Sequence, residues 1–262
     1  MRFILLFLLS FSVFAEVPVD VVFDIDLTIV TLINEGDPLA DPAHPRKGTI
    51  AVQYTEDGSL RKDRYRVFEG VKELLEKLRQ DPRVRLSFFS GGSDGRNLAL
   101  TKALKLSDGT SFFDLAQGRV YGRSVMTPTD APPTARIRDR FKKDLHTVNP
   151  DISDVIIVDD IKEFVPDSQR SHVLWIGENF PFPDRRTPTG PITEEVFQRE
   201  KNKYQWISSQ LDRALAERFQ TGRPLSAIVD ELTDHQRLTP FNSELLGPRC
   251  RPGEVLLRLL AE

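Results

Sequence analysis

The sequence has little cysteine and little histidine, and both scarcities exclude kinds of site. Cys250 is the one cysteine among 262 residues, so this sequence cannot form an internal disulfide. The four histidines, at positions 44, 146, 172 and 235, lack the short spacing with which histidines bind zinc. A glycine-rich nucleotide loop is also missing, as is the Ser-His-Asp order of a hydrolase triad. Carboxylates, hydroxyls and lysines remain as the candidates for chemistry.

The chain also lacks a strong excess of charge of either sign. Its 36 basic and 39 acidic residues give a formal net charge of −3. A balance this mild predicts no general affinity for nucleic acid or for an anionic membrane. Internal repeats, heptads and low-complexity tracts are absent too, and the length suits one α/β domain with additions.

Long apolar runs are missing except near the first residue. Residues 3–14 are apolar, Arg2 precedes them, and Val13 and Ala15 occupy the −3 and −1 positions of a cleavage site. This pattern predicts a secretory signal peptide over residues 1–15, cleaved after Ala15, with an uncleaved anchor as the alternative. A membrane-spanning helix needs about 20 apolar residues, so no stable membrane anchor is expected. Export without disulfides predicts a bacterial periplasmic or secreted protein.

Two carboxylates follow the first predicted strand. Residues 19–23 form a short β-branched run typical of a buried strand, and Asp24, Asp26 and Thr28 follow it in the string FDIDLTIV. In an open α/β sheet, ligands bind outside the carboxyl ends of the strands. One carboxylate there can act as a nucleophile while the other transfers protons, and the two attract a divalent cation such as Mg²⁺. The alternative is an acidic turn whose aspartates cap the next segment.

Two later strands are also predicted to end in polar groups. The run at 84–89 ends in Ser90 and two glycines, which together can bind a phosphate oxygen. The run at 154–158 ends in Asp159 and Asp160, a pair that needs a cation nearby. Between these runs, Lys142 and Lys143 offer ammonium groups suited to a phosphoryl group. The alternatives are an ordinary strand-to-helix turn at the serine and a solvated basic face at the lysines.

These residues resemble the four motifs of the haloacid dehalogenase superfamily. The superfamily has a DxDxT string, a strand-end Ser or Thr, a lysine and a strand-end acidic pair. All four kinds are present here, in that order.

Within the superfamily, the segment 142–160 resembles the FCP/SCP-type phosphatases, also called NLI-interacting-factor-like. The segment 65–78, YRVFEGVKELLEKL, is similar to the strand and helix before their second motif. The likeness spans roughly residues 19–176. It departs from the family pattern at Leu27, inside the first motif, and after the acidic pair, where Ile-Lys stands in place of Ser-Pro.

The resemblance implies a role for each residue. Asp24 would attack phosphorus and form an aspartyl-phosphate, and Asp26 would protonate the leaving group and then activate water. Ser90 would bind the phosphoryl oxygens, Thr28 would support the loop, and Lys143 would offset negative charge. Lys143 is preferred to its neighbour because it directly precedes Asp-Leu, as the family lysine does.

The resemblance also implies a cofactor and a reaction. Mg²⁺ would be held by the carboxylate of Asp24, the main-chain carbonyl of Asp26 and the carboxylate of Asp160, with Asp159 nearby. The reaction would be hydrolysis of a phosphomonoester, either a phosphoprotein or a small molecule. A phosphomutase, or a binding protein that keeps the fold without turnover, is the alternative.

The predicted fold is α/β, with a Rossmann-like parallel sheet of the haloacid dehalogenase type and helices on both faces. A catalytic core is expected over residues 16–176, carrying a small β-hairpin insertion at about 31–68 whose first part, 31–47, is expected to be loop. A Pro-rich connection and a C-terminal helical extension packed on the core are expected over 177–262. The extension is predicted to contain helices at 193–220, 225–232 and 254–260. No full cap domain fits between the motifs, so an open site is expected.

Overall fold

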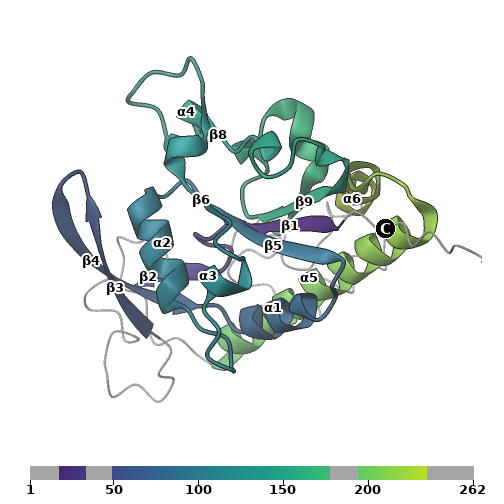
Figure 1. The fold of residues 1–262 in the computed structure, drawn as a ribbon, viewed down its shortest axis with the longest axis horizontal. Helices are drawn as coiled ribbons and strands as arrows, with labels where there is room; N and C mark the ends of the chain where they lie inside the picture. Colours follow the sequence, from purple (N-terminus) through teal and green to yellow (C-terminus); the bar gives the residue numbers. More distant parts are fainter. Residues whose placement is uncertain (1–17, 34–48, 178–193, 235–262) are drawn as a thin grey trace, which may run out of the picture.

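The computed structural model describes residues 18–33, 49–177 and 194–234. The predicted signal peptide, most of the predicted loop at 31–47, the Pro-rich connection and the predicted helix at 254–260 lie outside these ranges. A central sheet, a smaller sheet at one end and several helices make up the described parts of the chain (Figure 1).

A parallel sheet of five strands forms the centre of the molecule. Its strand order is β10-β9-β1-β5-β6, and every neighbouring pair is parallel. The strands are β1 (Val19–Phe23), β5 (Val84–Phe89), β6 (Val120–Tyr121), β9 (Val155–Asp159) and β10 (Val173–Trp175). Because β1 lies between β5 and β9, the strands that precede three of the motifs are neighbours. The predicted α/β fold with a parallel sheet is confirmed.

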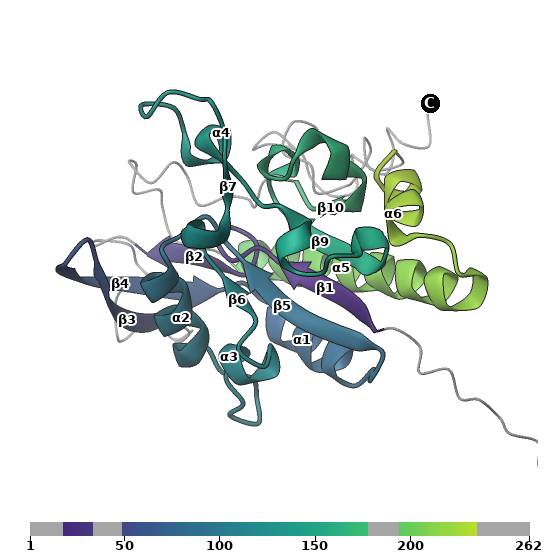
Figure 2. The ribbon, with the colours of Figure 1, turned by 45° about the horizontal axis from the view of Figure 1, so that its top comes forward.

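Side chains that alternate along each strand divide the core between the two faces of the sheet. In β1, Val21 and Phe23 belong to the larger apolar cluster and Val22 to the smaller one. The larger cluster includes side chains of α1 (Val71–Arg79), α2 (Asp94–Ala103) and α3 (Phe112–Leu115). The smaller cluster is covered by short helical segments, α4 (Ile137–Arg140), η3 (Leu145–Thr147) and η5 (Lys162–Phe164). Helices therefore lie on both faces, but the long ones lie on one face (Figure 2).

The remaining short elements connect these strands. They are η2 (Arg123–Val125), η4 (Ile152–Asp154), η6 (Asp167–His172) and the two-residue strands β7 (Thr127–Pro128) and β8 (Phe141–Lys142). The antiparallel pair β7–β8 carries the chain toward the motif lysine.

The insertion after the first motif is a separate antiparallel sheet with the order β2-β4-β3. Its strands are β2 (Val30–Ile33), β3 (Thr49–Glu56) and β4 (Ser59–Val67). The predicted hairpin is confirmed, and its turn places Asp57 and Gly58 at φ of 50° and 74°. The prediction of loop from residue 31 was wrong for residues 31–33, because this apolar stretch pairs with β4.

The C-terminal helices share the core of the sheet. They are α5 (Glu194–Thr221) and α6 (Leu225–Asp234), which confirms the helices predicted at 193–220 and 225–232. Tyr204, Ile207 and Leu211 of α5 are buried in the larger cluster, and the ring of Tyr204 stacks on Phe68 at 6.2 Å. In the parts of the chain that the structure describes, no helix is both long and apolar enough to cross a membrane.

Candidate active site

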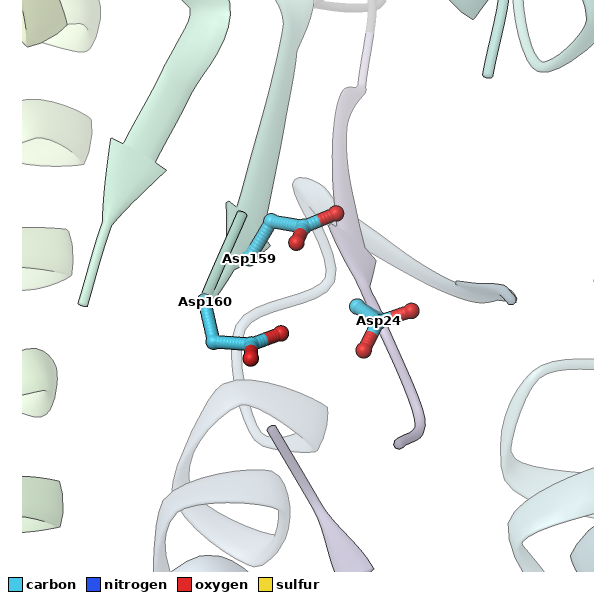
Figure 3. Close-up of side chains that lie close together, drawn as sticks. All are labelled: Asp24, Asp159 and Asp160. Carbon is cyan, nitrogen blue, oxygen red and sulfur yellow. The ribbon is translucent and has the colours of Figure 1, made fainter. Parts of the chain in front are cut away.

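Asp24 and the acidic pair meet at the carboxyl ends of two neighbouring strands. The register pairs Phe23 of β1 with Val158 of β9, and the amide of Asp24 donates to the carbonyl of Val158 at 3.0 Å. Asp159 and Asp160 extend from the end of β9 toward Asp24 (Figure 3). All three side chains are buried. Parallel pairing alone therefore gathers three carboxylates at one edge of the sheet.

A buried lysine lies between two of these carboxylates. The Nζ atom of Lys143 is 2.6 Å from Asp24 Oδ1 and 2.7 Å from Asp159 Oδ2, and it lies 4.6 Å from the centre of the Phe164 ring. The amide of Lys143 donates to the carbonyl of Phe164, which fixes its backbone. Lys142 points elsewhere and donates to two main-chain carbonyls. The structure places Lys143, and not Lys142, beside the candidate nucleophile.

Burial and mutual repulsion govern the ionisation of this cluster. Burial raises the pKa of Asp24 to about 7, although Lys143 opposes the shift. Burial also raises the pKa of Asp160 well above its ordinary value, and the neighbouring Asp159 and Asp24 add to the effect. Burial disfavours the charged form of Lys143, but the two carboxylates that it contacts raise its pKa above the usual range. Lys203, a second buried amine, acts to lower the pKa of Asp160, but burial and the neighbouring carboxylates outweigh it.

The donor set fits a hard divalent cation. Carboxylate oxygens of Asp24, Asp159 and Asp160 lie within 4.8 Å of one another. Both oxygens of Asp159 are engaged, one by Lys143 and the other by the amide of Ile161 at 2.8 Å. Among the described residues, no hydrogen-bond donor contacts the Asp160 carboxylate or Asp24 Oδ2. Carboxylate oxygens that accept no hydrogen bond from the described residues can serve as ligands to Mg²⁺, which is commonly held by one or two carboxylates.

Asp26 and Ser90 face each other across the same end of the sheet. The hydroxyl of Ser90 donates to Asp26 Oδ2 at 2.8 Å and accepts from the amide of Gly92 at 3.2 Å. Ser90 is fully buried, whereas 37% of the Asp26 side chain is exposed. Asp26 can therefore reach a ligand in solvent, as a proton carrier must.

Arg96, which the sequence analysis did not select, forms an ion pair with Asp26. It lies in α2, and its Nη1 is 2.7 Å from Asp26 Oδ2 while its Nη2 contacts Oδ1. Burial alone would raise the pKa of Asp26, but the Arg96 guanidinium and Ser90 bring it below its ordinary value. A single arginine six residues after the motif serine matches no known pattern, so sequence reasoning had no signal for it.

Thr28 lies in the segment that joins β1 to β2. It is fully buried, and within the described parts of the chain its Oγ1 has no hydrogen-bond partner. Its carbonyl accepts a hydrogen bond from the Tyr204 hydroxyl of α5. Leu27, where the sequence departs from the family pattern, adopts a left-handed φ of 60°. The loop is closed by the amide of Val30, which donates to the carbonyl of Ile25 at 3.0 Å.

A cleft of about 620 Å³ is lined in part by residues 93–95, which follow Ser90 closely in the sequence. The tip of the insertion forms one wall, and the start of α2 and the segment around η2 form the others. Its lining residues are Thr55, Glu56, Asp57, Ser93, Asp94, Gly95, Arg123, Ser124, Met126, Pro128 and Phe141. A space of this size accepts a small ligand or a few residues of a peptide.

Comparisons with known proteins find similarity to solved structures only at low sequence identity. No protein-family model matches the chain, and no curated protein matches it in sequence. The structure of Fcp1, an essential RNA polymerase II CTD phosphatase, is similar with a TM-score of 0.51 and 14% identity, over 82% of this chain and 70% of that one. A variant of the fission yeast phosphatase Fcp1 bound to beryllium fluoride has a TM-score of 0.47 and 16% identity, over 84% and 62%. At 14% identity, the first likeness establishes the fold.

Proposed function

We propose that this protein is an Mg²⁺-dependent phosphomonoester hydrolase that acts through an aspartyl-phosphate on Asp24. One observation carries the proposal, namely that two differently held carboxylates lie at one edge of the sheet. Asp24 is buried against Lys143, whereas Asp26 is partly exposed and held by Ser90. Two carboxylates in unlike surroundings suit a nucleophile and a proton carrier.

The reaction consists of two displacements at phosphorus. In the first, a carboxylate oxygen of Asp24 attacks phosphorus, the bond to the leaving oxygen breaks, and Asp26 gives that oxygen a proton. In the second, Asp26 removes a proton from water, the water oxygen attacks phosphorus, and the bond to Asp24 breaks. The lowered pKa of Asp26, which the Arg96 guanidinium and Ser90 produce, favours the ionised form that the second step requires. Lys143 offsets charge on Asp24 and the phosphoryl group in both steps.

Mg²⁺ would be held by Asp24 and Asp160, the members of the three-aspartate cluster whose carboxylates keep an oxygen that receives no hydrogen bond from the described residues. Asp159, with both oxygens engaged, would orient Lys143 instead. The main-chain carbonyl of Asp26 is a proposed further ligand. When bound, the cation would neutralise charge on the phosphoryl oxygens.

Hydrolysis of 4-nitrophenyl phosphate tests the proposal directly. The purified protein with Mg²⁺ should release 4-nitrophenolate and inorganic phosphate, and Asp24→Asn should lower the rate by about 10³-fold or more, since the nucleophile is lost. Asp151→Asn, which changes an exposed carboxylate far from this edge, serves as the matched control. Equal rates for the wild-type protein and Asp24→Asn would disprove the mechanism.

Two other functions use the same fold. A phosphomutase would return the phosphoryl group to its substrate and release no inorganic phosphate. A binding protein would hold a phosphorylated ligand without turnover. The exposed part of Asp26 favours turnover over mere binding, because it places a proton carrier at the site. Phosphate release measured beside substrate loss separates the three.

The substrate is proposed to be a phosphoprotein or a small phosphomonoester that enters the cleft of about 620 Å³. Export to the periplasm or medium through the signal peptide at residues 1–15 is part of the proposal. Cell fractionation with N-terminal sequencing tests it, and a mature protein that begins at Glu16 is the expected result.

A further inference from the structure

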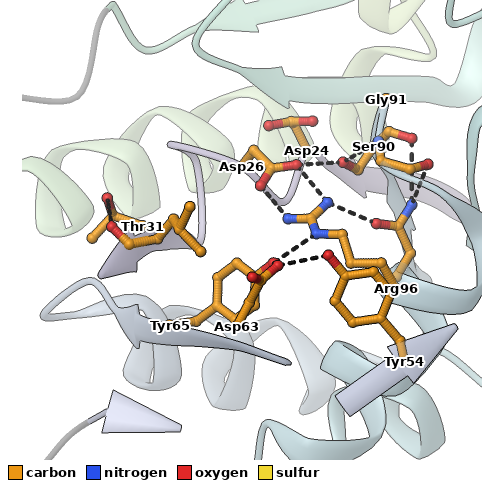
Figure 4. A network of polar contacts seen from close by, with 12 residues as sticks. Asp24, Asp26, Thr31, Tyr54, Asp63, Tyr65, Ser90, Gly91 and Arg96 are labelled. Carbon is orange, nitrogen blue, oxygen red and sulfur yellow. Dashed lines mark hydrogen bonds and ion pairs between the residues drawn. The ribbon is translucent and has the colours of Figure 1, made fainter. Parts of the chain in front are cut away.

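A buried arginine holds the proposed proton carrier. Arg96 is 7% exposed, and its two terminal nitrogens each contact one oxygen of Asp26 (Figure 4). Such a two-point contact fixes the plane of a carboxylate as well as its position, which a lysine cannot do. Ser90 donates to the same Oδ2 atom. The carboxylate of Asp26 is therefore held by three hydrogen bonds from two residues.

The backbone leaves room for this arginine at Gly92. A Cβ atom on Gly92 would lie 2.1 Å from Nη1 of Arg96 and 2.7 Å from Oδ1 of Asn97. Gly92 is not among the residues with positive φ, so its backbone conformation does not require glycine. Glycine is required at position 92 because the Arg96 guanidinium approaches its backbone closely. The local sequence is thus fitted to an arginine at position 96.

The insertion holds the other side of the arginine. Nε of Arg96 donates to the hydroxyl of Tyr65 at 3.0 Å, and the guanidinium carbon lies 5.3 Å from the centre of the Tyr65 ring. The Tyr65 hydroxyl donates to Asp63 at 3.0 Å, and Tyr54 donates to the same Asp63 oxygen at 2.6 Å. These three residues belong to β3 and β4. A chain of hydrogen bonds thus runs from the insertion to Asp26.

We propose that Arg96 is a positioning residue that aims the Asp26 carboxylate at the leaving oxygen, and that the insertion holds Arg96 in place through Tyr65. The inference rests on the proposed phosphatase function, because it concerns the proton that Asp26 transfers as the phosphorus–oxygen bond breaks. A displacement of about 1 Å in such a group lowers a rate by about 10²-fold. The insertion is then part of the catalytic unit, although it carries none of the four motifs.

Two substrates with different leaving groups test the proposal. 4-Nitrophenolate departs without a proton, whereas the alkoxide of 2-phenylethyl phosphate needs one. The ratio kcat/KM covers only the steps up to departure of the leaving group, so the second displacement does not affect it. Arg96→Ala should lower kcat/KM about 100-fold for the alkyl ester and less than about tenfold for the aryl ester. Added guanidinium ion should restore part of the loss.

Further variants separate positioning from folding. Tyr65→Phe keeps the ring and removes the hydroxyl that accepts from Arg96, so it should produce a smaller loss, again larger for the alkyl ester. Arg96→Lys keeps the charge but loses the two-point contact. Its kcat/KM for the alkyl ester should lie between the values for the wild type and Arg96→Ala. Lys102→Ala, an exposed position on α2, is the matched control. If Arg96→Ala does not fold, Arg96→Lys and Tyr65→Phe decide the question.

The outcomes distinguish this inference from the function on which it rests. Equal losses for the two esters in Arg96→Lys and Tyr65→Phe, or no loss for either ester, would overturn the positioning role while leaving the phosphatase intact. If the wild-type protein hydrolyses neither ester, the proposed function fails and the inference fails with it. A leaving-group dependence in Arg96→Lys that Lys102→Ala does not share would support the inference.

Discussion

At the scale of single residues, Lys143 is the cation on which the buried aspartates depend. Its side chain is fully buried, and it contacts Asp24 and Asp159 at hydrogen-bond distance. Lys143→Met would leave both carboxylates without this partner, so the free energy of unfolding should fall by about 3–5 kcal/mol. Urea unfolding in the presence of EDTA measures the change.

Lys142→Met is the control that the chain itself supplies. Lys142 donates to the carbonyls of Arg138 and Glu163 and contacts no carboxylate in the described structure. Its replacement should cost about 1 kcal/mol. Equal losses from the two substitutions would show that the ion pairs at Lys143 contribute nothing specific.

The same carboxylates should make Mg²⁺ binding depend on pH. Burial raises the pKa of Asp24 to about 7 and also raises that of Asp160, so protons compete with the cation in mildly acidic solution. Affinity for Mg²⁺ should therefore increase from pH 6 to pH 8. While the pH is below the pKa of a carboxyl group that must lose its proton, the increase is up to about tenfold per pH unit for that group. Calorimetric titration in buffers of different ionisation enthalpy measures affinity and proton release together. A dissociation constant unchanged over this range would contradict the prediction, and Asp160→Asn should weaken binding at both pH values.

At the scale of elements, a buried ion pair joins the insertion to the C-terminal helix. Arg66 of β4 and Glu200 of α5 are both nearly inaccessible, and they make two contacts, one of 2.8 Å and one of 2.5 Å. The same carboxylate accepts from the amide of Glu69, just before α1. The segment 66–69 and α5, which are far apart in sequence, thus meet at one side chain.

Loss of one partner of this pair should destabilise the protein strongly. Glu200→Gln removes a buried carboxylate charge that contacts Arg66 at two points, so about 3–5 kcal/mol should be lost. Lys77→Met breaks an exposed pair with Asp212 between α1 and α5 and should cost about 1 kcal/mol or less. Urea unfolding of both variants makes the comparison. Similar losses would mean that burial does not set the strength of these pairs.

The sequence predicted most of the elements because each strand and helix carries its own pattern. The strand-like runs at 19–23, 84–89 and 154–158 specified the central sheet and, through parallel pairing, the edge where the motifs meet. Arg96 escaped prediction because its partner, Asp26, lies 70 residues away in the chain. Contacts at such a distance depend on how α2 packs beside the sheet. Local periodicity carries no information about that packing.

At the scale of the whole molecule, the C-terminal helices belong to the main core. Leu211 and Ile228 are buried in the same cluster as Phe23 and Phe88 of the central sheet. A truncated chain that ends at residue 176 would expose this face. Burial of each large apolar side chain contributes about 1.5–3 kcal/mol. The summed loss from several such side chains exceeds a typical domain stability of 5–15 kcal/mol.

That truncation should therefore abolish cooperative folding, although all four motifs remain. Circular dichroism and thermal unfolding of the fragment, compared with the full chain purified in parallel, measure the effect. A fragment with a cooperative transition and unchanged hydrolysis would show that the motif-bearing part is an independent domain.

The missing side chain at Gly92 has a consequence for how this protein can change over evolutionary time. Any residue larger than glycine there would collide with the Arg96 guanidinium. A lineage could gain a side chain at position 92 after Arg96 was replaced and Asn97 was replaced or shifted, but the reverse order passes through a clash. The two positions are thus expected to vary together, and the order of their substitutions has a preferred direction.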